Sequence, residues 1–231
     1  MRYNKRMNER DSRTALLIGE SGVEKLKKSR VAVFGLGGVG SYCAEALARA
    51  GVGALVLVDK DTVEESNINR QLAAAYSTLG ERKTEVMKRR VLDVNPQCAV
   101  DVFPLFYLPE TQNEIDLSGC NYIADCIDNV TAKLLLIETA EKKNISVVSA
   151  MGAGNKLDPE KIRIADLNKT KVCPLARVMR RELRKRGISG VTVAYSEEEP
   201  VINADMVGSV SFVPSVMGLM MAGKIIRELV K

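Results

Sequence analysis

A glycine-rich turn between a buried strand and a helix is the feature that most restricts the folds open to this chain. Residues 31–34 are an apolar run, residues 35–40 have the sequence Gly-Leu-Gly-Gly-Val-Gly, and residues 41–50 place small apolar side chains at helical spacing. A second apolar run over residues 54–59 ends at Asp59. The segment therefore predicts one βαβ unit. Because such glycines let the backbone approach a phosphate at a helix N-terminus, the unit also predicts a nucleotide site.

The alternation of strands and helices continues along the chain. Further strands are predicted at residues 99–103, 121–126 and 145–150, and helices at residues 83–94 and 131–143. Apolar strands separated by helices predict an α/β fold: a Rossmann-like, doubly wound, mostly parallel sheet with helices on both faces. We expect residues 31–150 to form the nucleotide-binding core. Residues 1–30 precede it as a helical segment, and residues 151–231 complete the same domain on the substrate side.

The two flanking parts have their own predicted elements. A helix over residues 13–28 has Leu16, Leu17, Val23 and Leu26 as its apolar positions. In the C-terminal part, strands are predicted at residues 162–167 and 191–195, a basic helix at residues 174–186 and a closing helix at residues 214–229. The acidic stretch at residues 197–200 is predicted to be an exposed loop.

Composition excludes several kinds of chemistry. None of the 231 residues is histidine, so catalysis by a Ser-His-Asp or Cys-His arrangement and His-ligated zinc or haem are excluded. Five cysteines without a Cys-x-x-Cys pair predict free buried thiols and no structural zinc; they are Cys43, Cys98, Cys120, Cys126 and Cys173. The longest apolar run near the C-terminus, residues 212–222, is about half of a membrane span. With no secretory signal visible, we expect a soluble cytoplasmic protein that does not contact membranes.

Positive charge is concentrated in two blocks. Residues 1–30 contain nine Lys and Arg against four Asp and Glu, and residues 169–186 contain eight against one, whereas the whole chain has 34 against 29. The rest of the chain is therefore net acidic. Such clustering favours an acidic partner such as a nucleic acid, although solvated faces of amphipathic helices would give the same pattern.

The glycine motif alone does not choose between NAD and ATP. The residues that follow the second strand favour ATP, because cleaving a triphosphate requires several cations and a metal, whereas a nicotinamide site requires a shaped pocket. Arg70 and Lys83 are candidate cations, and Asp128 is a candidate metal ligand. An NAD-dependent oxidoreductase and a nucleotide-binding scaffold without turnover remain alternatives at this point.

Several motifs, in this order, resemble the adenylating family of ubiquitin-activating-type enzymes. They lie at residues 35–41, 59–61, 66–71, 80–83 and 125–130, preceded by an arginine segment at residues 10–13. The resemblance implies ATP and Mg²⁺ as cofactors. It implies that Asp59 holds the ribose hydroxyls, that the glycines approach the phosphates, that Asp128 binds Mg²⁺, and that Arg13 reaches the γ-phosphate in a homodimer's other subunit. The implied nucleotide-binding residues are Gly35, Gly37, Gly38, Gly40, Asp59, Asp61, Asn67, Arg70 and Lys83.

The second half of the chain resembles one branch of that family, the tRNA threonylcarbamoyladenosine dehydratases. The similar segments include Ser149-Ala-Met-Gly152-Ala-Gly154 and Leu157-Asp-Pro159. The resemblance implies adenylation of the threonyl carboxylate, followed by ring closure with release of AMP, and an associated sulfur-transfer protein. The predicted tRNA-binding residues lie on the basic helix: Arg177, Arg180, Arg181 and Arg184. The alternative is an adenylyltransferase for a small ubiquitin-like sulfur-carrier protein, although the zinc-binding Cys-x-x-Cys pairs usual in those enzymes are absent.

Overall fold

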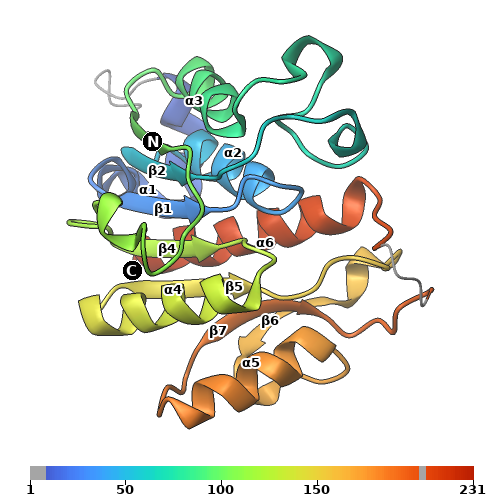
Figure 1. The fold of residues 1–231 in the computed structure, drawn as a ribbon. Coiled ribbons are helices and arrows are strands. Elements are labelled where there is room, and N and C mark those ends of the chain that lie inside the picture. Colours follow the sequence, from blue (N-terminus) through green and yellow to red (C-terminus); the bar gives the residue numbers. More distant parts are fainter. Residues whose placement is uncertain (1–8, 203–206) are drawn as a thin grey trace.

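A seven-stranded sheet organises the chain in the computed structural model, which describes residues 9–202 and 207–231. The strand order is β3-β2-β1-β4-β5-β7-β6 (Figure 1), and every neighbouring pair is parallel except β7 and β6. The predicted mostly parallel α/β sheet is therefore confirmed. The strands are β1 Arg30–Phe34, β2 Ala54–Val58, β3 Ala99–Phe103, β4 Tyr122–Asp125, β5 Ser146–Ala150, β6 Ile162–Asp166 and β7 Thr192–Ser196.

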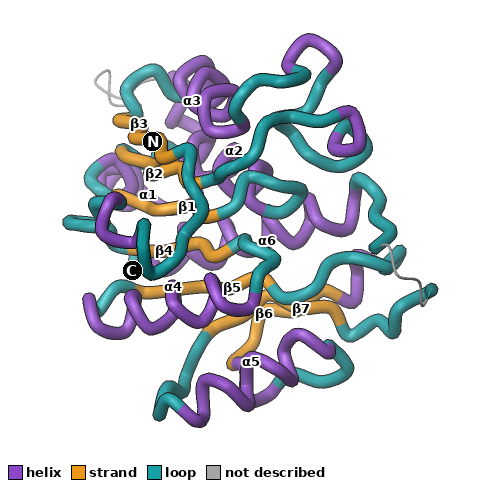
Figure 2. Tube along the Cα trace, in the orientation of Figure 1, coloured by secondary structure: helices purple, strands orange, loops and turns teal. Residues whose placement is uncertain are grey.

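Helices cover both faces of this sheet, as predicted (Figure 2). In the view of Figure 1, α6 runs behind the sheet and α4 lies in front of it. Alternate residues of β1 pack into different clusters, Val33 with residues of α2, α3 and α6, and Phe34 with residues of α4. The helices are α1 Ser12–Lys27, α2 Gly40–Ala50, α3 Lys83–Val94, α4 Val130–Lys143, α5 Pro174–Lys185 and α6 Phe212–Leu229.

The side of the sheet on which new strands are added changes between the neighbouring strands β1 and β4. From β1 the chain builds β2 and β3 on one side of the sheet, and it then returns to build β4 and β5 on the other side. The carboxyl ends of β1 and β4 therefore diverge into loops that leave in opposite directions. In open α/β sheets, this switch point is where ligands bind.

The N-terminal helix differs from its prediction in two respects. The helix expected over residues 13–28 is interrupted at Gly19, whose φ of 75° and ψ of 164° are not helical. In its first half the predicted apolar positions Leu16 and Leu17 are exposed, whereas Val23 and Leu26 in the second half are buried. Glycine adopts this backbone conformation without steric cost, so it allows the two halves to point in different directions. Residues 1–8 of the predicted N-terminal segment lie outside the described residues.

The acidic stretch at residues 197–200 is not simply an exposed loop, as was predicted. Glu198 is buried, and its carboxylate accepts hydrogen bonds from the backbone N–H groups of Leu157 and Asp158. The Lys156 ammonium group donates to the Glu198 carbonyl oxygen. Burial of this carboxylate is compatible with folding because two backbone N–H donors replace water.

Two other expectations concern cysteines and membranes. All five cysteines are free, and all except the half-buried Cys126 are buried. Among the described residues, no helix is both long enough and apolar enough to cross a membrane.

Candidate nucleotide-binding active site

A cavity of about 670 Å³ opens at the carboxyl ends of β1, β2, β4 and β5. It lies at the switch point of the sheet. Nine of the residues predicted to form the nucleotide site line it: Gly35, Gly37, Gly38, Asp59, Asp61, Asn67, Arg70, Lys83 and Asp128. The structure therefore brings together residues that are up to 93 positions apart in the sequence.

Two glycines of the turn are required because a larger side chain would clash with the neighbouring backbone. Gly35 has a φ of +83°, and a Cβ atom there would lie 2.7 Å from the Cys126 carbonyl oxygen. Gly40 is the first residue of α2 and does not line the cavity; a Cβ atom there would lie 1.7 Å from the Gly35 carbonyl oxygen. Gly40 therefore lets the helix approach the turn closely, and Gly37 and Gly38 are the glycines that face the cavity.

Asp59 follows β2 and fixes the glycine turn. Its Oδ2 atom accepts a hydrogen bond from the Leu36 N–H at 2.6 Å, and its Oδ1 atom accepts one from the Asp61 N–H at 2.8 Å. Burial raises the pKa of the Asp59 carboxyl, and the two backbone hydrogen bonds offset part of that shift. The carboxylate lines the cavity beside the turn, at the position from which this residue type binds ribose hydroxyls.

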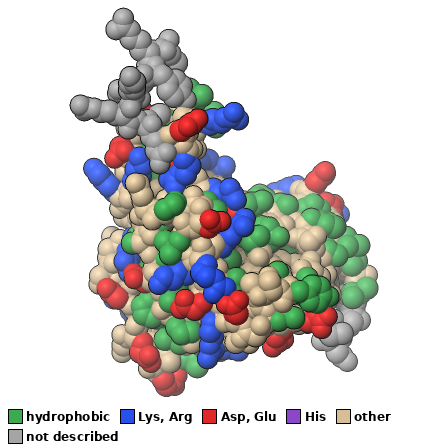
Figure 3. Space-filling view, turned by 90° about the horizontal axis from the view of Figure 1, so that it is seen from above, with side chains coloured by type: hydrophobic (Ala, Val, Ile, Leu, Met, Phe, Trp, Pro, Cys, Tyr) green, Lys and Arg blue, Asp and Glu red, His purple; other side chains and the backbone are tan. Residues whose placement is uncertain are grey.

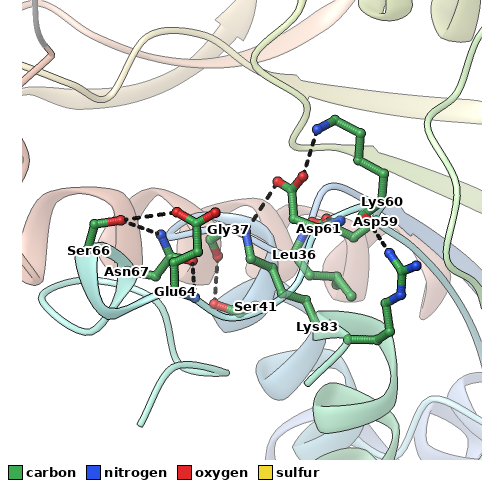
Figure 4. A network of polar contacts seen from close by, with 11 residues as sticks. Leu36, Gly37, Ser41, Asp59, Lys60, Asp61, Glu64, Ser66, Asn67 and Lys83 are labelled. Atoms are coloured by element: carbon green, nitrogen blue, oxygen red, sulfur yellow. Dashed lines mark hydrogen bonds and ion pairs between the residues drawn. The ribbon is translucent and has the colours of Figure 1, made fainter. Parts of the chain in front are cut away.

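Asp61 and Lys83 form an ion pair at the edge of the cavity (Figure 4). The Lys83 Nζ atom lies 3.3 Å from Asp61 Oδ2, and Lys60 Nζ lies 2.7 Å from Asp61 Oδ1. Partial burial alone would raise the pKa of Asp61, but the two ammonium groups hold it below its ordinary value. The Lys83 side chain is almost fully buried, so an anion entering the cavity would meet a weakly solvated cation.

The segment 66–71 contributes an amide, a guanidinium group and a second amide. The Asn67 carboxamide is held by the Glu64 N–H and by Ser66 Oγ. The Arg70 guanidinium donates to the Ser66 carbonyl oxygen at 2.9 Å and to Asn69 Oδ1 at 2.8 Å. Gln71, to which sequence reasoning assigned no role, is buried, lines the cavity and has no hydrogen-bond partner at Oε1 among the described residues. The one indication in the sequence that Gln71 belongs to the site is its position directly after Arg70.

Asp128 is an exposed carboxylate on the loop between β4 and α4. The described residues contain no group of three or more Cys, Asp and Glu side chains placed to hold a metal by themselves. Mg²⁺ commonly takes one or two carboxylates together with substrate phosphates, so a single carboxylate beside a phosphate site fits its chemistry. Beneath this loop, Lys133 donates to Asp125 Oδ2 at 2.9 Å, and both side chains are fully buried.

The last residue of β5 and residues from the C-terminal part of the chain form an apolar side of the cavity that the sequence did not predict. They are Ala150, Met151, Ala153, Leu175, Val207 and Pro214. The cavity therefore has one polar side, formed by residues between Asp59 and Lys83, and one apolar side. Exposed hydrophobic side chains also gather on the half of the molecule where the parallel strands end (Figure 3).

Arg13 is placed apart from the other predicted site residues. It is exposed on the first half of α1 and does not line the cavity of its own chain. In a single chain, the structure therefore brings together all the predicted catalytic residues except this one.

The four predicted tRNA-binding arginines lie together on α5. With Lys185, they line a surface groove of about 320 Å³. Arg180 differs from the others, because its guanidinium donates to the carbonyl oxygens of Leu167 and Thr170 and to Thr170 Oγ1. Arg181 is paired with Glu182, which the surrounding Lys185 and Arg181 groups hold at a pKa of about 2. Arg177 and Arg184 are exposed and keep their charges available at the groove.

Comparison with known proteins decides the family. The model of the ThiF family matches residues 11–231, which is nearly the whole chain. The chain belongs to the ThiF family. The resemblance to ubiquitin-activating-type adenylating enzymes is thereby confirmed at the level of the family.

Among relatives in the ThiF family, the tRNA threonylcarbamoyladenosine dehydratase of Bacillus subtilis is 44% identical over 239 aligned positions, covering 95% of this chain and 94% of that protein. Two solved structures of the Escherichia coli tRNA N6-threonylcarbamoyladenosine dehydratase, TcdA, superpose with a TM-score of 0.91 and cover 99% of this chain and 97% of theirs. One is a complex with AMP at 34% identity, and the other is a complex with ATP at 33% identity.

Proposed function

We propose that this chain dehydrates threonylcarbamoyladenosine in tRNA to a cyclic product, using ATP to activate the threonyl carboxylate. The observation that supports this most directly is the cavity at the switch point, where Arg70, Lys83 and Asp128 face the glycine turn. The similarity to dehydratases over nearly the full length supports the same substrate. Association with a sulfur-transfer protein stays a prediction from the resemblance.

The first step is attack of the threonyl carboxylate on the α-phosphorus of ATP. A carboxylate oxygen forms a bond to phosphorus, the bond to the β-phosphate oxygen breaks, and pyrophosphate leaves with the electron pair. Lys83 is buried near the phosphate site and Arg70 is held by two oxygen acceptors, so both cations are positioned before charge develops. Fixed cations of this kind stabilise the transition state without further reorganisation.

The second step closes a ring within the substrate. A nitrogen of the carbamoyl group attacks the activated carbonyl carbon, the bond to the AMP oxygen breaks, and the nucleoside has lost one water overall. Both reacting groups belong to the same side chain, so proximity supplies much of the acceleration. The chain has no imidazole to accept the proton of the attacking nitrogen, so this proton passes to solvent, and AMP is a good enough leaving group to depart without protonation.

Asp128 would hold Mg²⁺ together with the phosphates of ATP. When bound, the metal would neutralise phosphate charge and withdraw electron density from phosphorus. Asp59 and Asp61 are less suited to this task, because Asp59 accepts two backbone hydrogen bonds and Asp61 is paired with Lys60 and Lys83.

A homodimer would complete the site. Arg13 is exposed and lies outside the cavity of its own chain, and it shares the first half of α1 with the exposed Leu16 and Leu17. Exposed leucines of this kind would be covered in a two-fold interface, which would also carry Arg13 toward the partner's cavity.

The test is to incubate the purified protein with ATP, Mg²⁺ and tRNA bearing the threonylcarbamoyl group, and then to weigh the released nucleosides. We expect loss of one water, and a fall of about a hundredfold or more in rate for Asp128→Asn or on chelation of Mg²⁺. Asp93→Asn changes an exposed carboxylate on α3 and is the matched control. An unchanged nucleoside with the unmodified protein would overturn the proposal, and AMP formation driven instead by a small carrier protein would favour the adenylyltransferase alternative.

A further inference from the structure

Residues 207–209, which we call the strap, connect the two sides of the active-site cavity. Val207 and Ser209 both line the cavity. Hydrogen bonds tie the strap to the phosphate side through Asn69 and to the apolar side through Asn155. These two attachments come from loops that follow different strands.

Asn155 makes the more extensive attachment. Its Oδ1 atom accepts a hydrogen bond from the Gly208 N–H at 2.6 Å, and its own N–H donates to the Gly208 carbonyl oxygen at 2.8 Å. Its carbonyl oxygen accepts a further bond from the Val201 N–H at 2.9 Å. The side chain therefore completes a closed ring of two hydrogen bonds with one residue of the strap. Asn155 has a φ of 57°, a conformation that asparagine tolerates better than most residues.

The other attachment leads to a residue of the proposed adenylation chemistry. Asn69 Nδ2 donates to the Ser209 carbonyl oxygen at 3.0 Å, and Asn69 Oδ1 accepts from Arg70 at 2.8 Å. The strap is thus held by the same amide that helps to orient the Arg70 guanidinium. A displaced strap would disturb the apolar side first, because Arg70 keeps its second bond to the Ser66 carbonyl oxygen.

Val207 makes the strap part of the apolar side. A Cβ atom on Gly154 would lie 2.1 Å from Val207 Cγ1, so the absence of a side chain at residue 154 makes room for the valine. Val207 is 67% exposed, which is high for a side chain of this type. It is therefore placed to meet a bound substrate, with Met151 and Leu175 lining the same side.

We propose that Asn155 is a positioning residue that holds the strap in place, so that the strap keeps water away from the acyl adenylate. The proposal rests on the proposed function, because it concerns the fate of that intermediate. Exclusion of water from a closed site prevents hydrolysis of reactive intermediates. A residue that touches neither ATP nor the reacting carbon can contribute in this way through the backbone that it holds.

Two reactions compete for the intermediate. In ring closure, the carbamoyl nitrogen forms a bond to the acyl carbon and releases its proton to solvent, and AMP leaves with the electron pair of the broken acyl–oxygen bond. In the wasteful reaction, a water oxygen forms that bond, AMP leaves in the same way, and the original carboxylate is restored. The net result of the second reaction is ATP plus water giving AMP and pyrophosphate. The ratio of AMP to cyclised nucleoside therefore measures how well water is excluded.

The central variant is Asn155→Gly, which fits the positive φ and removes the side chain together with its carboxamide. We expect it to raise the amount of AMP formed in excess of cyclised nucleoside by about fivefold, the effect of one lost hydrogen bond on an equilibrium between a held and a displaced strap. ATP affinity should not change. Asn155→Asp keeps an acceptor oxygen and should restore the ratio. Asn144→Gly makes the same substitution at another asparagine with positive φ, at the end of α4, and should leave the ratio unchanged.

A second variant tests the strap directly if Asn155→Gly folds poorly. Val207→Ala truncates an exposed side chain without altering the backbone hydrogen bonds, and it should also raise the ratio. A ratio of one AMP per cyclised nucleoside in both variants would overturn the proposal, as would an equal rise in Asn144→Gly. Failure of the proposed function is distinct, because the unmodified protein would then form no cyclised nucleoside.

Discussion

Two carboxylates separated by a single residue have opposite environments in the active site. Asp59 turns inward and accepts hydrogen bonds from two backbone N–H groups, and burial raises its pKa. Asp61 lies at the edge of the cavity, where Lys60 and Lys83 keep its pKa low despite partial burial. The motif predicted both residues as part of the site. It could not predict that their pKa values shift in opposite directions, because Lys83 reaches Asp61 only through the fold.

Lys133 and Asp125 give a prediction at the same scale. Their ion pair lies beneath the Asp128 loop, with both side chains fully buried and Ser149 Oγ donating to Asp125 at 2.5 Å. Lys133→Met leaves a buried carboxylate without its counter-charge, so we expect the free energy of unfolding to fall by about 3–5 kcal/mol. Urea unfolding followed by circular dichroism measures this.

Lys143→Met, at the exposed end of the same helix, is the control and should change stability by less than about 0.5 kcal/mol. Because the pair is costly to desolvate, removing both charges in Lys133→Met with Asp125→Asn should restore part of the loss. If Lys133→Met were as stable as Lys143→Met, the Asp125 carboxylate would not be effectively buried in solution.

At the scale of the elements, the sequence predicted the sheet well and the outer surfaces less well. Apart from Arg30 at the start of β1, strands β1 and β2 are apolar, as expected where helices cover both faces, and this pattern can be recognised in a single sequence. The break at Gly19 and the burial of Glu198 could not be predicted in this way. Both depend on which segment packs against them, and residues 157 and 158 meet Glu198 only through the fold.

Helix α5 gives a testable prediction at the scale of a single element. Because Arg180 is bonded to the carbonyl oxygens of Leu167 and Thr170, we expect Arg177 and Arg184 to supply most of the phosphate contacts. Arg177→Glu with Arg184→Glu should weaken tRNA binding and lower the slope of log affinity against log salt by roughly one per lost contact. Filter binding over a series of salt concentrations gives both quantities.

The matched control reverses two charges on α3, at Lys88 and Arg89. This helix packs on the other face of the sheet through Met87 and Val91, and Arg89 pairs with Glu81 much as Arg181 pairs with Glu182 on α5. That variant has the same net charge, so a general electrostatic effect would weaken binding equally in both proteins. An unchanged salt slope in the α5 variant would locate the tRNA elsewhere. Arg180→Glu should instead lower the melting temperature, since its guanidinium satisfies backbone carbonyl groups.

At the scale of the whole molecule, the cavity of a single chain holds most of the proposed machinery and lacks one cation. Arg70, Lys83 and Asp128 meet at the carboxyl edge of the sheet, whereas Arg13 is on the exposed half of α1. The sequence predicted this division only through the resemblance to a family. Spacing along one chain cannot show that a residue acts in another subunit, because nothing in its local pattern differs from an ordinary surface arginine.

Complementation between two inactive variants tests the shared site. Arg13→Ala and Lys83→Ala should each be inactive as homodimers. When both are co-expressed with different affinity tags, the purified heterodimer contains one complete site, because the Arg13→Ala subunit keeps its own Lys83 and receives Arg13 from its partner. We therefore expect about half of the unmodified activity per dimer. A heterodimer of Lys83→Ala with Arg70→Ala is the control and should stay inactive, since both residues line the same chain's cavity. Recovery of no heterodimer, or of one without activity, would show that each chain works with its own residues alone.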